Sequence, residues 1–223
     1  NENDSASTVP FKVHTINEVR IVTDYNYKNR SKAFTDSTNY EGYKLYSYEK
    51  LKYTPKAITD AVSIAPGEIF RDIDRTLTYN QISDLRNFKY PNITYQEDPK
   101  DTTGTGLITT ILLNPRKKYT FDASFDAYTS TIQQFGIGFT GGLLIRNVFR
   151  GAENLEISAN GSVGSSKDNA DSNSSFFNTS DVGANVKLTF PRILFPLDTD
   201  KFIPKYTSPT TTISAGLNSQ NNI

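Results

Sequence analysis

The sequence predicts a small α+β domain followed by the first antiparallel strands of a transmembrane β-barrel. The first half combines short strand patterns with two helix signals, and the second half alternates apolar and polar residues over several segments. Because successive side chains of a strand point to opposite faces, alternation with period two predicts strands. The apolar side of the first three alternating segments carries no charge, as a lipid-facing surface requires.

The composition limits the chemistry that the chain can perform. Its 223 residues include one His and no Cys, Met or Trp, which excludes disulfides, zinc clusters and histidine-based triads. The formal net charge is zero, so bulk electrostatics give no reason to expect a nucleic-acid partner. No apolar run is long enough for a transmembrane helix. We expect no enzymatic activity, no cofactor and no metal site.

The first fifty residues contain one clear strand pattern. Residues 1–10 are polar, lack the features of a signal peptide and form the expected flexible lead-in of a chain that is part of something longer. Val13, Ile16, Val19 and Ile21 predict a strand within 11–25. The tyrosine-rich segment 26–51 has no sustained period. A small hairpin and an ordered loop both remain open for it, with an aromatic sugar site as a less favoured alternative.

Helix signals follow, and then two more strands. Thr54 and Pro55 predict a helix start, and the apolar side chains after them share one face until the stop at 65–67. Asp72 is expected as the cap of a second helix with an imperfect apolar stripe, which Pro91 prevents from continuing. Short strands are expected at 92–97 and 107–113. This order, β-α-α-β-β, predicts an α+β domain with its own modest core.

The second half alternates in five segments, expected as strands at 119–128, 135–145, 155–163, 181–190 and 210–217. Nine or ten residues span about 30 Å, and a tilt of about 40° reduces this to about 23 Å. That height is close to the apolar band of about 25 Å in outer-membrane barrels. A soluble antiparallel sheet packed on a core gives the same alternation, so periodicity alone leaves both interpretations open.

The acidic residues of this half do not predict a catalytic or metal site. Asp122, Asp126 and Glu156 lie on the polar side of their strands, where a water-filled lumen tolerates them. Asp168, Asp171 and Asp181 in the loop 165–181 do not have the spacing of a known calcium loop.

Several runs resemble one protein family. Residues 53–55, 65–70 and 85–90 resemble the helical part of a POTRA domain, and 112–118 resemble its exit. Residues 135–138 and the run Arg146 to Glu153 resemble the second barrel strand and first periplasmic turn of surface-antigen outer-membrane proteins. These are the BamA/TamA-like assembly factors, and the resemblance covers nearly the whole chain from residue 11.

The resemblance implies a topology and a location. Residues 11–116 would form a POTRA domain in the periplasm, and 117–223 would form the first strands of a sixteen-stranded barrel in the outer membrane. Connections 129–134 and 165–181 would be extracellular, whereas 146–153 and 191–209 would be periplasmic. Because five strands leave unpaired edges in lipid, the rest of the barrel is expected outside this chain.

The resemblance also implies partners and site residues. Unfolded outer-membrane β-barrel clients would pair with the first barrel strand at a weak seam, in contact with outer-membrane lipids. Gly136 and Gly138 would allow that region to flex. A POTRA edge strand would dock clients or accessory lipoproteins. The seam residues are Tyr119, Thr120, Phe121, Asp122, Ala123, Ser124, Phe125 and Asp126; the POTRA edge is Asn92, Ile93, Thr94, Tyr95, Gln96 and Glu97; the turn motif is Arg146, Asn147, Phe149, Arg150 and Gly151.

Two other functions remain open at this stage. One is a two-partner-secretion translocator, which moves a single substrate. The other is a soluble β-rich module that binds glycans. A sealed interior containing Phe121, Phe125, Ile137 and Leu188 would contradict the membrane interpretation.

Overall fold

The computed structural model describes residues 12–129, 133–166, 177–194 and 207–222. The chain divides into two compact units, Asn1–Asp84 with Phe88–Pro115, and Leu85–Asn87 with Arg116–Ile223. The expected boundary after residue 116 lies next to this division, but Leu85–Asn87 group with the second unit instead of the first. The expected lead-in at 1–10 lies outside the described residues.

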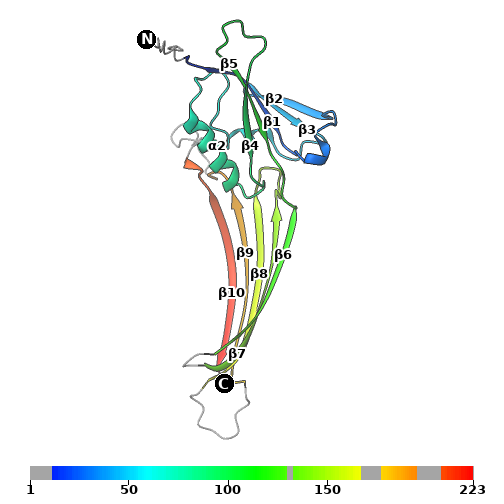
Figure 1. The fold of residues 1–223 in the computed structure, drawn as a ribbon. Coiled ribbons are helices and arrows are strands. Elements are labelled where there is room, and N and C mark those ends of the chain that lie inside the picture. The colour runs from blue at the N-terminus through cyan, green and yellow to red at the C-terminus, as the bar shows by residue number, and fades with distance from the viewer. Residues whose placement is uncertain (1–11, 130–132, 167–176, 195–206, 223) are drawn as a thin grey trace, which may run out of the picture. The chain divides into compact units, whose positions relative to one another are not determined.

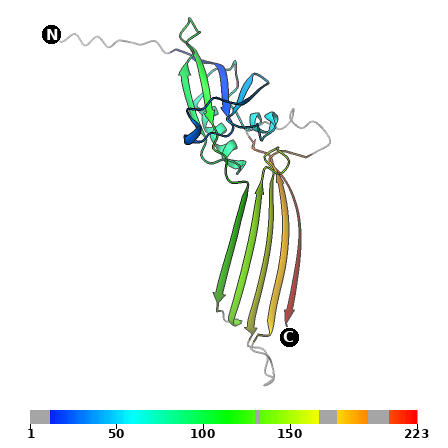
Figure 2. The ribbon, with the colours of Figure 1, turned by 90° about the vertical axis from the view of Figure 1, so that its right-hand side faces the viewer.

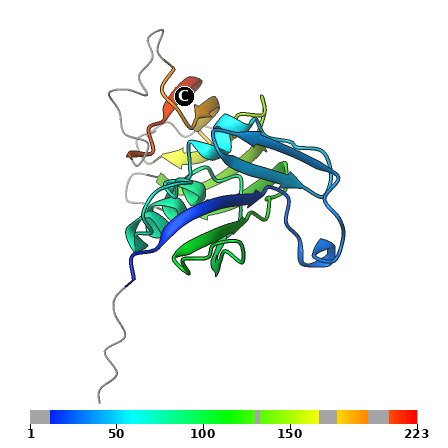
Figure 3. The ribbon, with the colours of Figure 1, turned by 90° about the horizontal axis from the view of Figure 1, so that it is seen from above.

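The first unit contains a five-stranded sheet in the order β2-β3-β1-β5-β4 (Figures 1 and 3). Strand β1 lies parallel to both of its neighbours, β3 and β5, while β2–β3 and β4–β5 are antiparallel pairs. A short 3-10 turn over Tyr27–Asn29 lies between β1 and β2. The strands are β1 (Thr15–Val22), β2 (Asp36–Tyr40), β3 (Tyr43–Ser47), β4 (Asn92–Glu97) and β5 (Gly106–Leu112).

The tyrosine-rich segment forms the hairpin β2–β3, and this changes the predicted element order. The expected β-α-α-β-β arrangement gains two strands, which extend the same sheet beyond β1. Alternate β3 side chains, Tyr43, Leu45 and Ser47, are buried. The period-two signal was present at these positions, but Lys44 and the flanking polar residues made the segment look irregular.

Helix α1 (Pro55–Thr59) is shorter than predicted, whereas α2 (Asp72–Asp84) includes Asp72, the expected cap, as its first residue. Beyond Thr59 the backbone bonds tighten, because Ala61 N donates to Ile58 O at 3.1 Å instead of to a carbonyl four residues back. The predicted apolar face is nevertheless buried, since Ile58 and Ala61 both lie in the core. No helix in the described part of the chain is long and apolar enough to cross a membrane.

The core of the first unit lies between its sheet and its helices. The Tyr53 and Phe88 rings pack together with centroids 4.9 Å apart. Thr78 of α2 is buried, and its Oγ1 accepts hydrogen bonds from Ser63 N at 2.9 Å and Ile64 N at 3.3 Å. The largest fully buried apolar side chains are Val19, Ile21, Leu45, Ile58, Val62, Ile82, Phe88, Ile111 and Leu113.

The second unit contains a fully antiparallel sheet in the order β10-β9-β8-β7-β6 (Figures 1 and 2). All five predicted strands are present, and most are longer than predicted. Strand β10 continues to Asn222 because the polar residues after Leu217 still pair through the backbone with β9. The strands are β6 (Tyr119–Tyr128), β7 (Gln133–Arg146), β8 (Asn154–Ser166), β9 (Thr179–Phe190) and β10 (Thr211–Asn222).

Candidate functional site

One face of the second sheet, here called the apolar face, presents uncharged side chains from edge to edge. The register aligns Phe121 with Leu143, Leu143 with Ile157, Ile157 with Val186, and Val186 with Ala215. A slip of one residue would turn every side chain of a strand to the other face, so the register follows the sequence pattern. The neighbouring rows are Tyr119–Ile145–Leu155–Leu188–Ile213, Ala123–Gly141–Ala159–Ala184–Leu217, Phe125–Phe139–Gly161–Val182–Ser219 and Ala127–Ile137–Val163–Ser180–Asn221.

The apolar face does not pack on a protein core formed by the described residues. Phe121 is 74% exposed and Phe125 is 72% exposed, while Leu217 at the other edge strand is 83% exposed. Among the described residues of this unit, Leu85 and Ala152 are the buried apolar side chains, and both lie outside the strands. The sealed interior that would contradict the membrane interpretation is therefore not formed by the described residues.

The opposite face of this sheet is polar and carries all of its charges. Glu156 and Lys187 are direct cross-strand partners and form an ion pair at 2.7 Å. Asn160 Nδ2 donates to Asp181 Oδ1 at 3.3 Å. Gly136 lies here too, under the Tyr128 ring, and any side chain at this position would run into that ring. The structure shows that the Tyr128 ring would have to move to make room for a side chain at this position. The flexing role expected for Gly136 stays a prediction.

The predicted seam strand β6 forms one edge of the sheet, and its backbone groups point alternately inward and outward. Arg146 N donates to Lys118 O at 2.8 Å, which makes these two residues a hydrogen-bonded pair. Such pairs alternate along an antiparallel ladder. Thr120, Asp122, Ser124 and Asp126 therefore direct N–H and C=O toward β7. The N–H and C=O groups of the alternate residues point away from β7, toward the open edge; these residues are Tyr119, Phe121, Ala123 and Phe125.

The predicted POTRA edge, β4, lies at an edge of the first sheet. Asp98 N donates to Gly106 O at 2.9 Å, so the same alternation leaves the N–H and C=O of Ile93, Tyr95 and Glu97 facing outward. The Tyr95 ring packs edge-on against Phe70 with centroids 4.9 Å apart, and burial raises the pKa of Tyr95 to about 12. The backbone of this strand is thus available for pairing, while its inward side chains anchor it. The remaining members of the predicted edge, Asn92, Thr94 and Gln96, pair with β5.

The turn between β7 and β8 is held by its own side chains. The Arg146 guanidinium donates from Nε to Arg86 O at 2.9 Å and from Nη1 to Lys117 O at 2.9 Å. Asn147 Oδ1 accepts from Ala152 N at 3.1 Å. Asn147, Arg150 and Ala152 all have positive φ, at 54°, 70° and 63°. Three left-handed residues in one turn need such anchoring, because each is unfavourable for a residue with a Cβ.

A buried carboxylate lies at the centre of this turn. The Glu153 side chain is 0% exposed, and its Oε1 accepts from Arg192 Nη2 at 2.9 Å. Its Oε2 accepts from Phe149 N at 3.2 Å and from Gly151 N at 2.9 Å. A Cβ at Gly151 would collide with the same carboxylate. Of the predicted turn motif, Arg146, Asn147 and Gly151 build this arrangement, whereas Phe149 is 62% exposed and Arg150 is exposed as well.

Three residues that hold the β7–β8 turn, Asn87, Asn154 and Arg192, were not identified from the sequence. Asn87 Nδ2 donates to Ala152 O at 2.8 Å, and Asn154 Nδ2 donates to Leu85 O at 2.9 Å. Arg192 was placed in a connection without a role. These partners are far apart in sequence, so no local spacing identifies them. The position of Glu153 directly after the small residues Gly151 and Ala152 was the available signal that this carboxylate is buried.

The structure gives no sign of a metal site in the described residues, where no group of three or more His, Asp or Glu side chains is placed to hold an ion. Asp168 and Asp171 lie outside the described residues.

Comparisons with known proteins give similarity of structure only. No protein-family model matches the sequence, and a search of curated proteins finds no match. The fold is similar to BamA from Haemophilus ducreyi lacking POTRA domains 1-3, with TM-score 0.36 and 10% identity, over 93% of this chain and 51% of that one. It is also similar to CdiB from Acinetobacter baumannii, with TM-score 0.38 and 11% identity, over 96% of this chain and 56% of that one. CdiB from Escherichia coli matches with TM-score 0.37 and 9% identity, over 85% and 44%.

The chain thus spans about half the length of the solved structures it matches.

Proposed function

We propose that this chain is the POTRA-plus-first-strands portion of an outer-membrane assembly factor, which folds client β-barrels by pairing their strands with the edge of β6. The observation that carries the proposal is the uncovered, charge-free apolar face, which runs across five paired strands and ends at that edge. The POTRA domain would lie in the periplasm.

The apolar face has the dimensions of a membrane-spanning band. Its rows extend from Tyr119 to Ala127 along β6, which is about 27 Å of strand and about 21 Å of height at a tilt of about 40°. One Lys or Arg at the bilayer midplane would cost about 2–4 kcal/mol, and none occurs in these rows. A contiguous exposed apolar surface of this kind marks a membrane or partner interface.

Backbone pairing supplies the chemistry. An unpaired strand edge in lipid leaves N–H and C=O groups unsatisfied at several kcal/mol each, so the β6 edge needs a strand beside it. A client strand would satisfy it through main-chain hydrogen bonds, which tolerate many side-chain sequences. The outward groups of Ile93 and Tyr95 on β4 would dock unfolded clients or an accessory lipoprotein in the same way.

Two adjacent proline substitutions in the full-length protein test the seam. Ala123→Pro removes an N–H that faces the open edge, and proline is tolerated at such positions. Ser124→Pro removes an N–H that pairs with β7. We expect Ala123→Pro to leave the barrel folded and slow client insertion, whereas Ser124→Pro disrupts the barrel itself. Gel mobility of the folded form and client folding rates in vesicles measure the two effects. If the Ala123→Pro variant folds clients at the wild-type rate, the assignment of the β6 edge as the seam is wrong.

Depletion of the full-length protein tests the class of function. A general assembly factor predicts a fall in the levels of many outer-membrane proteins. A two-partner-secretion translocator predicts the loss of one secreted substrate with the others unchanged. The soluble glycan-binding alternative requires a closed core beneath the second sheet, which the described residues do not form.

A further inference from the structure

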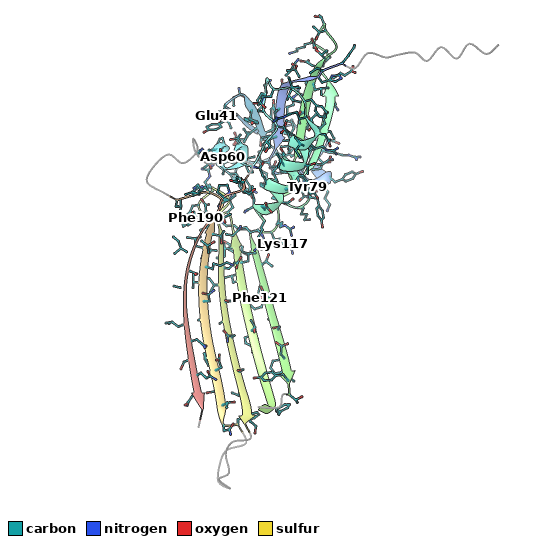
Figure 4. All side chains as sticks on the ribbon, turned by 90° about the vertical axis from the view of Figure 1, so that its left-hand side faces the viewer. Glu41, Asp60, Tyr79, Lys117, Phe121 and Phe190 are labelled. Carbon is teal, nitrogen blue, oxygen red and sulfur yellow. The ribbon has the colours of Figure 1, made fainter. Side chains whose placement is uncertain are left out.

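The cationic side chains among the described residues of the second unit lie at one end of its sheet. The turn end is here the end where β6 begins and where the β7–β8 turn lies. Figure 4 places Lys117 and Phe190 at this end and Phe121 further along β6. The described residues of the opposite end include the carboxylates Asp126 and Asp181 and no cation. Those of the turn end include Arg86, Arg116, Lys117, Lys118, Arg146, Arg150, Lys187 and Arg192 against Glu153 and Glu156.

Both carboxylates among the described residues of the turn end already have cationic partners. Glu153 accepts from Arg192, and Glu156 forms ion pairs with Lys187 at 2.7 Å and Arg86 at 3.5 Å. Lys117 and Lys118 are exposed and form no ion pair with any carboxylate in the described part of the chain. Within the described residues, two ammonium groups are therefore left to attract an anion.

Two aromatic rings mark the level at which the apolar face ends. Tyr119 belongs to the first apolar row, and Phe190 lies one step beyond Leu188 on the same side of β9. The Lys118 ammonium lies 5.8 Å from the Tyr119 ring centroid, and the Arg192 guanidinium lies 5.8 Å from that of Phe190. Aromatic rings with cations beside them, at the rim of an apolar band, are typical of the level of lipid headgroups.

We propose that Lys117 and Lys118 bind the phosphates of anionic phospholipids in the leaflet that borders the turn end. This proposal rests on the membrane-spanning sheet proposed above and adds the headgroup chemistry. A lysine ammonium is a compact point charge on a flexible stem, which suits a mobile headgroup. A phosphatidylglycerol phosphate has no ammonium of its own, whereas in phosphatidylethanolamine a headgroup amine competes with the lysine. The site therefore prefers the anionic lipid.

Lipid retention by the full-length protein tests the proposal. The protein is placed in nanodiscs with equal amounts of phosphatidylglycerol and phosphatidylethanolamine of the same acyl chains, and retained lipids are counted by native mass spectrometry. Each surface lysine contributes about fivefold in binding to an anionic surface. The double variant Lys117→Gln, Lys118→Gln is therefore expected to lose about 30-fold of the preference for phosphatidylglycerol, and Lys117→Arg, Lys118→Arg is expected to keep most of it.

Lys187→Gln is the matched control, because it removes a cation from the same end that is already paired with a carboxylate, that of Glu156. A preference unchanged in the double variant, or lost equally in Lys187→Gln, would overturn the proposal. A protein that enters no lipid nanodisc or vesicle contradicts the membrane-spanning sheet itself. One that enters them and shows no headgroup preference contradicts the lysine site alone.

Discussion

Removing the buried Glu153 carboxylate gives the sharpest prediction for the second unit. In Glu153→Ala, the N–H groups of Phe149 and Gly151 lose their acceptor inside a closed turn, at about 1–3 kcal/mol each. Arg192 is 43% exposed, so water can solvate it, and the lost ion pair adds at most about 1 kcal/mol. We expect a total of about 4 kcal/mol for Glu153→Ala. Glu153→Gln keeps an amide oxygen as acceptor, and we expect about 1–2 kcal/mol.

The measurement combines urea unfolding of the full-length protein in a lipid environment with hydrogen exchange at the Phe149 and Gly151 amides. Glu156→Gln is the matched control, because this carboxylate is partly exposed on the polar face and its ion pairs are worth about 1 kcal/mol or less. The reasoning is refuted if Glu153→Ala costs no more than Glu156→Gln, or if both amides exchange as slowly as in the unchanged protein.

Three further predictions concern the first unit. Hydrogen bonds from the Thr103 hydroxyl and nearby N–H groups hold the pKa of Asp101 well below its usual range. The loop 98–106 is therefore fully stabilised above about pH 4, the ordinary range of a free Asp, and loosens only as pH falls toward the lowered pKa. The protection factor of the Gly106 amide, which corrects for the intrinsic pH dependence of exchange, should show this, and Asp101→Asn should reduce its pH dependence. The buried Tyr95 hydroxyl has no hydrogen-bond partner, so Tyr95→Phe should raise the free energy of unfolding by about 1 kcal/mol, and a loss of that size would reveal an unseen partner. Thr78→Val should cost about 2–4 kcal/mol in chemical denaturation because two buried N–H groups lose their acceptor, whereas Thr78→Ser, which keeps the hydroxyl, should cost about 1 kcal/mol.

The strands of the second unit were predictable because a single rule governs them. Alternation such as that of Phe121 and Phe125 fixes which face is apolar, and the same rule fixes the register once neighbouring strands share that face. The strand ends were less predictable. Asn218 and the residues after it carry no apolar signal, yet their backbone groups still pair with β9. Sequence patterns report side-chain burial, whereas strand length depends on backbone pairing.

Partners between distant segments were outside the reach of sequence patterns. Asn87 and Ala152 meet through a side-chain bond to a backbone carbonyl, and nothing in either residue specifies the other. The helix α1 shows a related limit. Its apolar spacing correctly predicts that Ile58 and Ala61 are buried, although a tight turn delivers Ala61 to the core where a longer helix was expected.

The motif of the β7–β8 turn contains residues that the buried Glu153 carboxylate requires as well as an exposed side chain that it does not. Gly151 is small because the Glu153 carboxylate occupies the space that its side chain would need, and the Glu153 side chain accepts hydrogen bonds from two N–H groups and Arg192. These three positions must therefore change together or not at all. The Phe149 side chain meets no such requirement, since it is 62% exposed. Substituting it should leave the fold intact and change only what the turn contacts, which separates the turn's structural role from its role in recognition.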